Sequence, residues 1–146
     1  MLKIKVSKFV RPLDLGEYVP ELAGQTISVW VNPPREKVLA YGDILKAIDG
    51  FGVEISRLEA RMKAEPENAV DIVEEINAMT KRIKKANDSL FAWYAEIWSQ
   101  GDEEESIESV REFATSTMDT DPALWRWVAQ STVLMISAHR AGAKKG

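Results

Sequence analysis

The chain has 146 residues, 45% of them hydrophobic and 29% charged, which are ordinary values for one globular domain. Its formal net charge of -4 excludes a general nucleic-acid binder, which needs a basic field, and the absence of cysteine excludes disulfides, thiolate metal sites and cysteine nucleophiles. No segment has the apolar run of a signal peptide or of a membrane span, so we expect a soluble intracellular protein with no membrane partner.

Residues 1–32 are predicted to form β-strands and an ordered loop. Leu2–Ser7 alternates apolar and polar residues, the pattern of a half-buried strand whose lysines suit a sheet edge. Arg11–Gln25 is interrupted by prolines and glycines but is rich in apolar residues, which indicates an ordered loop. Thr26–Val31 alternates again and predicts a second strand. Trp30 lies on its more polar face, where it either packs under the loop or contacts a partner.

A helical body is predicted over residues 33–140. Asn32 and the two prolines after it are typical of a helix start, and Gly50 is typical of a helix end. A second helical piece follows, with Ser56 in a capping-box position. Glu65–Asn68 then breaks the chain before the next helix.

The helix that begins at Ala69 is acidic at its start and basic near Ala86, which complements the helix dipole. The basic cluster Lys81–Lys85 is interpreted as a solvated helix end, since no aromatic residues interleave with the charges. Apolar spacing runs on toward Gln100, so either one long helix or two helices broken at Asn87–Ser89 fits. The predicted stripe is Val73, Ile76, Thr80 and Ile83.

The stretch Asn87–Gly101 carries more apolar mass than any other short segment. It has one stripe at helical spacing, predicted to start after a cap at Asp88 and to end at Gly101: Leu90, Trp93, Tyr94, Ile97 and Trp98. Such a stripe is either the hub of a helical core or an interface anchor.

Two more helices are predicted after this stretch. The acidic run Asp102–Ser106 is placed in the first turn of one helix, where negative charge is favoured. Asp121 and Pro122 end that helix and start the last one, which reaches Arg140 and is apolar on more than one face. Residues 141–146 are expected to form a disordered tail.

No arrangement of residues indicates catalysis or a cofactor. The sequence has no phosphate-binding loop and singles out no carboxylate pair. His139, the one histidine, is interpreted as a cation near the carbonyl end of the last helix. We therefore expect no enzyme, no metal and no cofactor. The predicted fold is a single domain, 1–146, that is mainly α: a helical bundle-like body with a small amino-terminal β-hairpin or two-stranded sheet.

One segment, LDLGEYVPELAGQTISVWVNPPREKV at positions 13–38, resembles the amino-terminal region of tail assembly chaperones from long-tailed bacteriophages. The similarity covers about the first third of the chain. It implies a non-enzymatic assembly factor of the bacterial host cytoplasm, absent from the mature virion. Such a factor binds the long helical tape-measure protein and helps recruit tail-tube subunits.

In many members of that family a ribosomal slip near the end of the frame makes an extended product, which contacts the tail-tube protein. The ending Ala143, Lys144 and Lys145 permits a slip sequence, A AAA AAG, in the coding DNA. The role needs adaptable apolar surface, and it also favours a homo-oligomer. The candidate partner-binding residues are Trp30, Trp93, Trp98, Trp125 and Trp127, with Met135 beside them.

A different class of function fits the same residues. A small helical adaptor or regulatory subunit would use this aromatic surface for another protein partner. The chaperone hypothesis predicts association with a very long helical protein, whereas the adaptor hypothesis does not.

Overall fold

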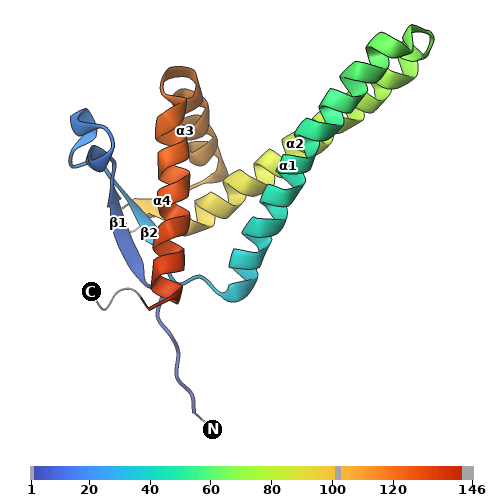
Figure 1. Cartoon of the computed structure of the whole chain (residues 1–146). Helices are drawn as coiled ribbons and strands as arrows, with labels where there is room; N and C mark the ends of the chain where they lie inside the picture. The colour runs from blue at the N-terminus through green and yellow to red at the C-terminus, as the bar shows by residue number, and fades with distance from the viewer. Residues whose placement is uncertain (1, 101–102, 143–146) are drawn as a thin grey trace. The chain divides into compact units, whose positions relative to one another are not determined.

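The computed structural model describes residues 2–100 and 103–142, and these are mainly helical with a small antiparallel sheet (Figure 1). This confirms the mainly α fold class with a small β element, but the sheet has four strands instead of the predicted two, because residues 98–100 and 103–104 add to the amino-terminal hairpin. The strands are β1 (Val10–Asp14), β2 (Thr26–Trp30), β3 (Trp98–Gln100) and β4 (Glu103–Glu104), in the order β1-β2-β3-β4. The helices are α1 (Arg35–Ala64), α2 (Ala69–Ile97), α3 (Ile107–Thr120) and α4 (Pro122–Arg140), and short 3-10 helices lie at Leu15–Glu17, Pro20–Leu22 and Pro66–Asn68.

By its internal contacts the chain divides into two compact units. The sheet unit holds the described residues of Met1–Arg35 and Ala92–Gly146, and the hairpin unit is Glu36–Phe91. Helix α2 passes from the second unit into the first without a break. The single domain expected for residues 1–146 stays a prediction, because it concerns cooperative unfolding.

The sheet unit is built on an antiparallel ladder in which Val10 lies opposite Trp30 and Asp14 opposite Thr26. One face of this ladder is apolar and buried, and it carries Leu13, Ile27 and Val29. Helix α4 lies over the sheet (Figure 1). The predicted strand at Thr26–Val31 is thus confirmed, to within one residue at its end.

The strand predicted at Leu2–Ser7 is wrong. Residues 2–9 form no regular secondary structure, and β1 lies in the segment expected to be a loop. Alternation favours a strand only where a partner strand supplies hydrogen bonds, and β2 pairs with Val10–Asp14 instead. Between β1 and β2 the loop is tight: a Cβ on Gly16 would lie 2.5 Å from the Cα of Ala23, and Gly24 takes φ +88°.

The helix end predicted at Gly50 is also wrong, because α1 continues through it to Ala64. The residues that keep α1 helical alternate at spacings of three and four, and all are buried or half-buried: Tyr41, Ile44, Ile48, Phe51, Ile55, Leu58 and Met62. Packing of this seam against α2 outweighs the roughly 1 kcal/mol that one glycine costs in a helix. The break predicted at Glu65–Asn68 is confirmed.

Helix α2 is one helix to Ile97, which settles the two alternatives in favour of the long helix. Asp88 therefore lies inside this helix, and the cap predicted there is wrong. The helix end predicted at Gly101 falls outside the described residues. The predicted stripe is half right: Ile76 and Ile83 belong to the seam, whereas Val73 and Thr80 are exposed. The true seam also alternates at spacings of four and three: Ile72, Ile76, Met79, Ile83, Ala86, Leu90, Trp93 and Ile97.

Helix α3 begins after Ser106, whose hydroxyl accepts a hydrogen bond from the Ser109 amide at 3.1 Å. The acidic run expected in its first turn is instead partly in β4, at Glu103–Glu104, so that prediction is wrong. The cap at Asp121 and the helix start at Pro122 are confirmed. Of the predicted disordered tail, Ala141 and Gly142 form a turn and 143–146 lie outside the described residues.

Candidate functional site

Three of the five tryptophans proposed for partner binding lie in one aromatic cluster in the sheet unit. The rings of Tyr94 and Trp98 stack with centroids 4.3 Å apart, and Trp125 meets both edge-on at 5.6 and 5.9 Å. Trp93 packs edge-on against Tyr94 at 5.3 Å. Trp93 and Trp98 are only 5% and 2% exposed, so the core interpretation of this stripe is confirmed. In this fold neither side chain is available to a partner.

A buried hydrogen bond fixes the orientation of Trp98 within the aromatic cluster. Its Nε1 donates to the Thr132 hydroxyl at 3.0 Å, and that hydroxyl donates in turn to the Val128 carbonyl at 2.8 Å. Thr132 is fully buried. The pair links the start of β3 to the middle of α4, two segments 34 residues apart.

The remaining two tryptophans are half-buried and are not brought together with the cluster. Trp127 stacks on Tyr18 with centroids 5.4 Å apart. Trp30 donates from Nε1 to the Asn32 amide oxygen at 3.0 Å, and the Lys8 ammonium lies 4.6 Å from its ring centroid. The predicted tryptophan surface is therefore dispersed, and partner binding through Trp30, Trp125 and Trp127 stays a prediction.

Metal binding and proton transfer would each require that side chains of the described residues lie close together. No group of three or more His, Asp or Glu side chains among them is placed to hold a metal ion. His139 and Ser131 line the same groove, but they are eight residues apart on α4, about 12 Å along the axis, too far for direct proton transfer.

An open groove runs between α1 and α2 in the hairpin unit, with a volume of about 380 Å³. We call it the hairpin groove. Its floor is apolar, with Ile44, Ala47 and Phe51 on α1 and Ala86 on α2. Its polar lining consists of three charged residues and one serine: Asp43, Arg82, Lys85 and Ser89. The sequence indicated the basic cluster Lys81–Lys85, but it did not predict a groove beside that cluster.

The closed end of the hairpin is held by a small ionic network. Arg61 contacts Glu65 at 3.2 Å and Glu75, across the turn on α2, at 2.9 Å. The Asn68 amide donates to Glu65 at 3.0 Å. The pKa of Glu65 is lowered below its ordinary value, first by the Asn68 hydrogen bond and then by Arg61, whose own pKa is raised.

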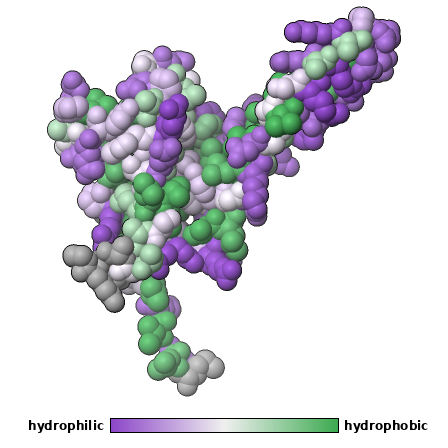
Figure 2. Space-filling model, viewed as in Figure 1, coloured by the Kyte–Doolittle hydropathy of each residue, from purple (hydrophilic) through white to green (hydrophobic). Residues whose placement is uncertain are grey.

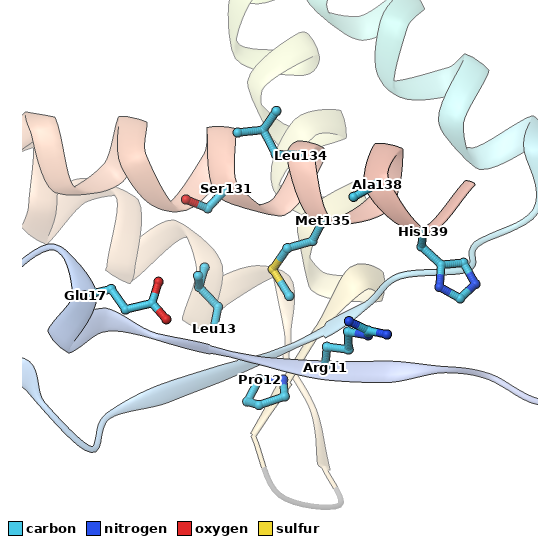
Figure 3. A pocket seen from close by; sticks show the side chains of 9 residues that line it. All are labelled: Arg11, Pro12, Leu13, Glu17, Ser131, Leu134, Met135, Ala138 and His139. Atoms are coloured by element: carbon cyan, nitrogen blue, oxygen red, sulfur yellow. The ribbon is translucent and has the colours of Figure 1, made fainter. Parts of the chain in front are cut away.

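A second groove, of about 700 Å³, lies in the sheet unit between β1 and α4 (Figure 3). We call it the edge groove. Leu13 and Met135 point into it from opposite sides, with Arg11 and His139 at one end and Glu17 at the other (Figure 3). Because its walls lie more than a hundred residues apart in the chain, no local pattern in the sequence could have revealed it.

The described part of the chain is thus helix-rich and has an apolar-lined groove in each of its two units. Comparison of the chain with protein-family models, curated proteins and solved structures finds no significant match. No helix of the described residues is long and apolar enough to cross a membrane.

Proposed function

We propose that the protein is a non-enzymatic tail assembly chaperone of a long-tailed bacteriophage. In this role it holds the tape-measure protein during tail assembly in the bacterial cytoplasm, associates with itself, helps recruit tail-tube subunits, and is absent from the finished virion. The observation that carries the proposal is the hairpin groove, a surface suited to a long amphipathic helix. The resemblance of positions 13–38 supplies the family.

The hairpin unit has the residue pattern of an antiparallel two-stranded coiled coil. Within this unit its two seams keep the alternating spacing of three and four residues over about six turns of α1 and about five turns of α2. A two-stranded coil leaves its grooves open, and a third helix with an apolar stripe adds to it by the same knobs-into-holes packing. Tape-measure proteins are long and helical, so this mode of binding suits them.

The charge around the groove favours a particular kind of helix. Arg82 and Lys85 are exposed and line its α2 side, while Asp43 lies on the α1 side. The two cations attract a helix whose apolar stripe is flanked by acidic residues. Because the attraction is between exposed groups, salt should weaken binding.

The adaptor hypothesis would place the same groove against another protein. The two hypotheses differ in the partner, so the test is co-expression with a tape-measure protein of a long-tailed bacteriophage. We expect this chain to keep that protein soluble and to purify with it. Failure to do either would favour the adaptor.

Matched variants on α2 locate the interaction. R82E/K85E reverses the two cations of the hairpin groove, while K81E/K84E makes the same charge change on the same helix at exposed residues outside the groove lining. We expect R82E/K85E to weaken binding at least about tenfold and K81E/K84E to have much less effect. Equal loss in both variants would show that only net charge matters and would overturn the groove as the site.

The coding DNA tests the family directly. A slip sequence A AAA AAG at Ala143–Lys145, with an open -1 frame behind it, would support an extended product that contacts the tail-tube protein. If that product exists, it should bind tube subunits, and the chain that ends at Gly146 should not.

A further inference from the structure

The segment Leu2–Ser7 is an extended arm that leaves an apolar stripe uncovered. Leu2, Ile4 and Val6 are 85%, 75% and 84% exposed. No strand in the described part of the chain pairs with the arm, although its alternation is that of a strand with one apolar face. Figure 2 shows hydrophobic side chains along this arm and over the exposed side of α4. Three large apolar residues on one stripe are a surface that association would cover.

The root of the arm is fixed, and it directs the arm away from its own sheet. The Asn32 amide oxygen accepts from the Phe9 amide at 2.6 Å, and its Nδ2 donates to the Ser7 carbonyl at 2.9 Å. The Phe9 ring lies 5.6 Å from that of His139. To return to the free edge of its own β1, the chain would have to reverse at residues 7–10 and break these contacts.

The edge groove includes a free strand edge, that of β1, with which the unpaired arm could form backbone hydrogen bonds. In the β1–β2 ladder the hydrogen-bonded pairs fall at odd positions of β1, as the bond from Leu15 to Gln25 and the bond from Val31 to Phe9 show. Val10, Pro12 and Asp14 therefore turn their peptide groups to the free edge. Their carbonyls can accept from an added strand, and Pro12 removes only one donor.

The dimensions and the apolar lining also match the arm. Five residues of the arm, Leu2–Val6, extend over about 17 Å, the same length as the five residues of β1. A strand added beside β1 would turn Leu2, Ile4 and Val6 toward the α4 side of the groove. That side carries Leu134, which is 67% exposed, together with Met135 and Ala138.

Charge favours the same pairing. The arm carries Lys3 and Lys5 on its polar face and Lys8 at its root, with no acidic residue in positions 1–8. Since the whole chain has a net charge of -4, the remaining residues, 9–146, sum to -4 - 3 = -7. A cationic arm is thus attracted to the body of another copy as a whole, while the groove lining itself carries both Arg11 and Glu17.

We propose that the arm of one copy of this chain binds as an added β-strand in the edge groove of a second copy. In a symmetric pair each copy gives its arm and receives that of its partner. The proposal rests on the arm, its root and the edge groove, and not on the hairpin groove or on a tape-measure protein. It shares with the proposed function only the expectation that the chain associates with itself, and it can fail or hold independently of tape-measure binding.

Disulfide trapping tests which copy the arm contacts, and the natural chain has no cysteine to interfere. I4C in the arm and A138C in the groove are made in separate chains and mixed under oxidising conditions. We expect a mixed disulfide-linked pair. M118C, at an exposed position on α3, is the matched control and should not link to I4C above background. A disulfide formed within one chain of the double variant I4C/A138C, with no link between chains, would overturn the proposal.

Sedimentation over a concentration series tests the energetics. We expect the unmodified chain to be dimeric or larger. Both L2S/I4S/V6S and A138R should weaken this association and raise its dissociation constant at least about tenfold. S137R is the control, since Ser137 is the adjacent exposed residue of α4 and does not line the groove. Melting curves establish that each variant folds. A monomeric unmodified chain, or an oligomer that both variants leave unchanged, would overturn the proposal.

Discussion

The two units of this chain are stabilised in different ways. The sheet unit is held by contacts between segments distant in sequence, with an aromatic cluster at its centre and most of the buried apolar side chains. In the hairpin unit only Leu58, Ile72 and Met79 are buried among the described apolar residues, and its other seam residues remain half-exposed. The partly covered apolar seam of the hairpin unit is the surface on which the proposed binding of a long helix depends.

The largest effect is expected from the aromatic cluster. Replacing a buried tryptophan by alanine costs about 3–5 kcal/mol, and W93A/W98A removes two, a loss comparable to the whole stability of a small domain. We expect the double variant to lose the cooperative transition of the sheet unit, measured by tryptophan fluorescence on heating. W127A, at a half-buried ring stacked on Tyr18, is the control and should lose much less. Cooperative melting retained in W93A/W98A would contradict the core interpretation.

The next largest effect tests whether the two units unfold independently. L58A removes the fully buried leucine of the hairpin seam and should cost about 2–5 kcal/mol. All five tryptophans lie in the sheet unit, so their fluorescence reports that unit alone, while circular dichroism reports the helices of both.

We expect L58A to lower the helical transition and leave the fluorescence transition in place. L39A, at an exposed position of the same helix, should change neither. If both transitions fall together, the units unfold as the single domain that the sequence predicts.

A smaller effect is expected from the buried hydroxyl that links β3 to α4. T132V keeps the shape of the side chain but leaves the Trp98 N–H without its acceptor, which should cost about 1–3 kcal/mol in denaturant unfolding. T117V is the matched control: the Thr117 hydroxyl is also buried, and it bonds to the Phe113 carbonyl on its own helix. An equal cost in both variants would mean that the cross-element bond adds nothing.

The smallest effect is expected at the hairpin turn. The pKa of Glu65 is lowered in the folded chain, so its carboxylate stabilises the hairpin above its ordinary pKa of 4.5, and this contribution disappears as the pH falls through the folded value. E65Q should slightly lower the melting temperature at neutral pH and lose that difference well below pH 4.5. E67Q, a neighbouring exposed carboxylate in the same turn, is the control. A difference that persists in acid would exclude the ionic contribution.

The sequence predicted the elements whose signals are local. The stripe around Trp93 and Tyr94 repeats at helical spacing, and Asp121 with Pro122 is a strong helix start, so both were found. The prediction at Gly50 failed because the seam on either side of the glycine packs against α2, which a local reading of the residue omits.

Pairing between distant segments could not be predicted. Leu2–Ser7 has the better strand pattern, but β2 pairs with Val10–Asp14. Likewise Trp98 continues the helical stripe in sequence, yet it leaves the helix to pair with Val29. Both grooves depend on such contacts, so the sequence could indicate an apolar binding surface without placing it.

The central claim is that the hairpin unit binds a long amphipathic helix while the sheet unit supports it. Hydrogen–deuterium exchange measures this most directly, with the chain alone and with a tape-measure protein added. We predict slower exchange on binding at 43–51 and 82–89, the segments that line the hairpin groove. Unchanged exchange in these segments, with protection confined to the sheet unit, would contradict the account.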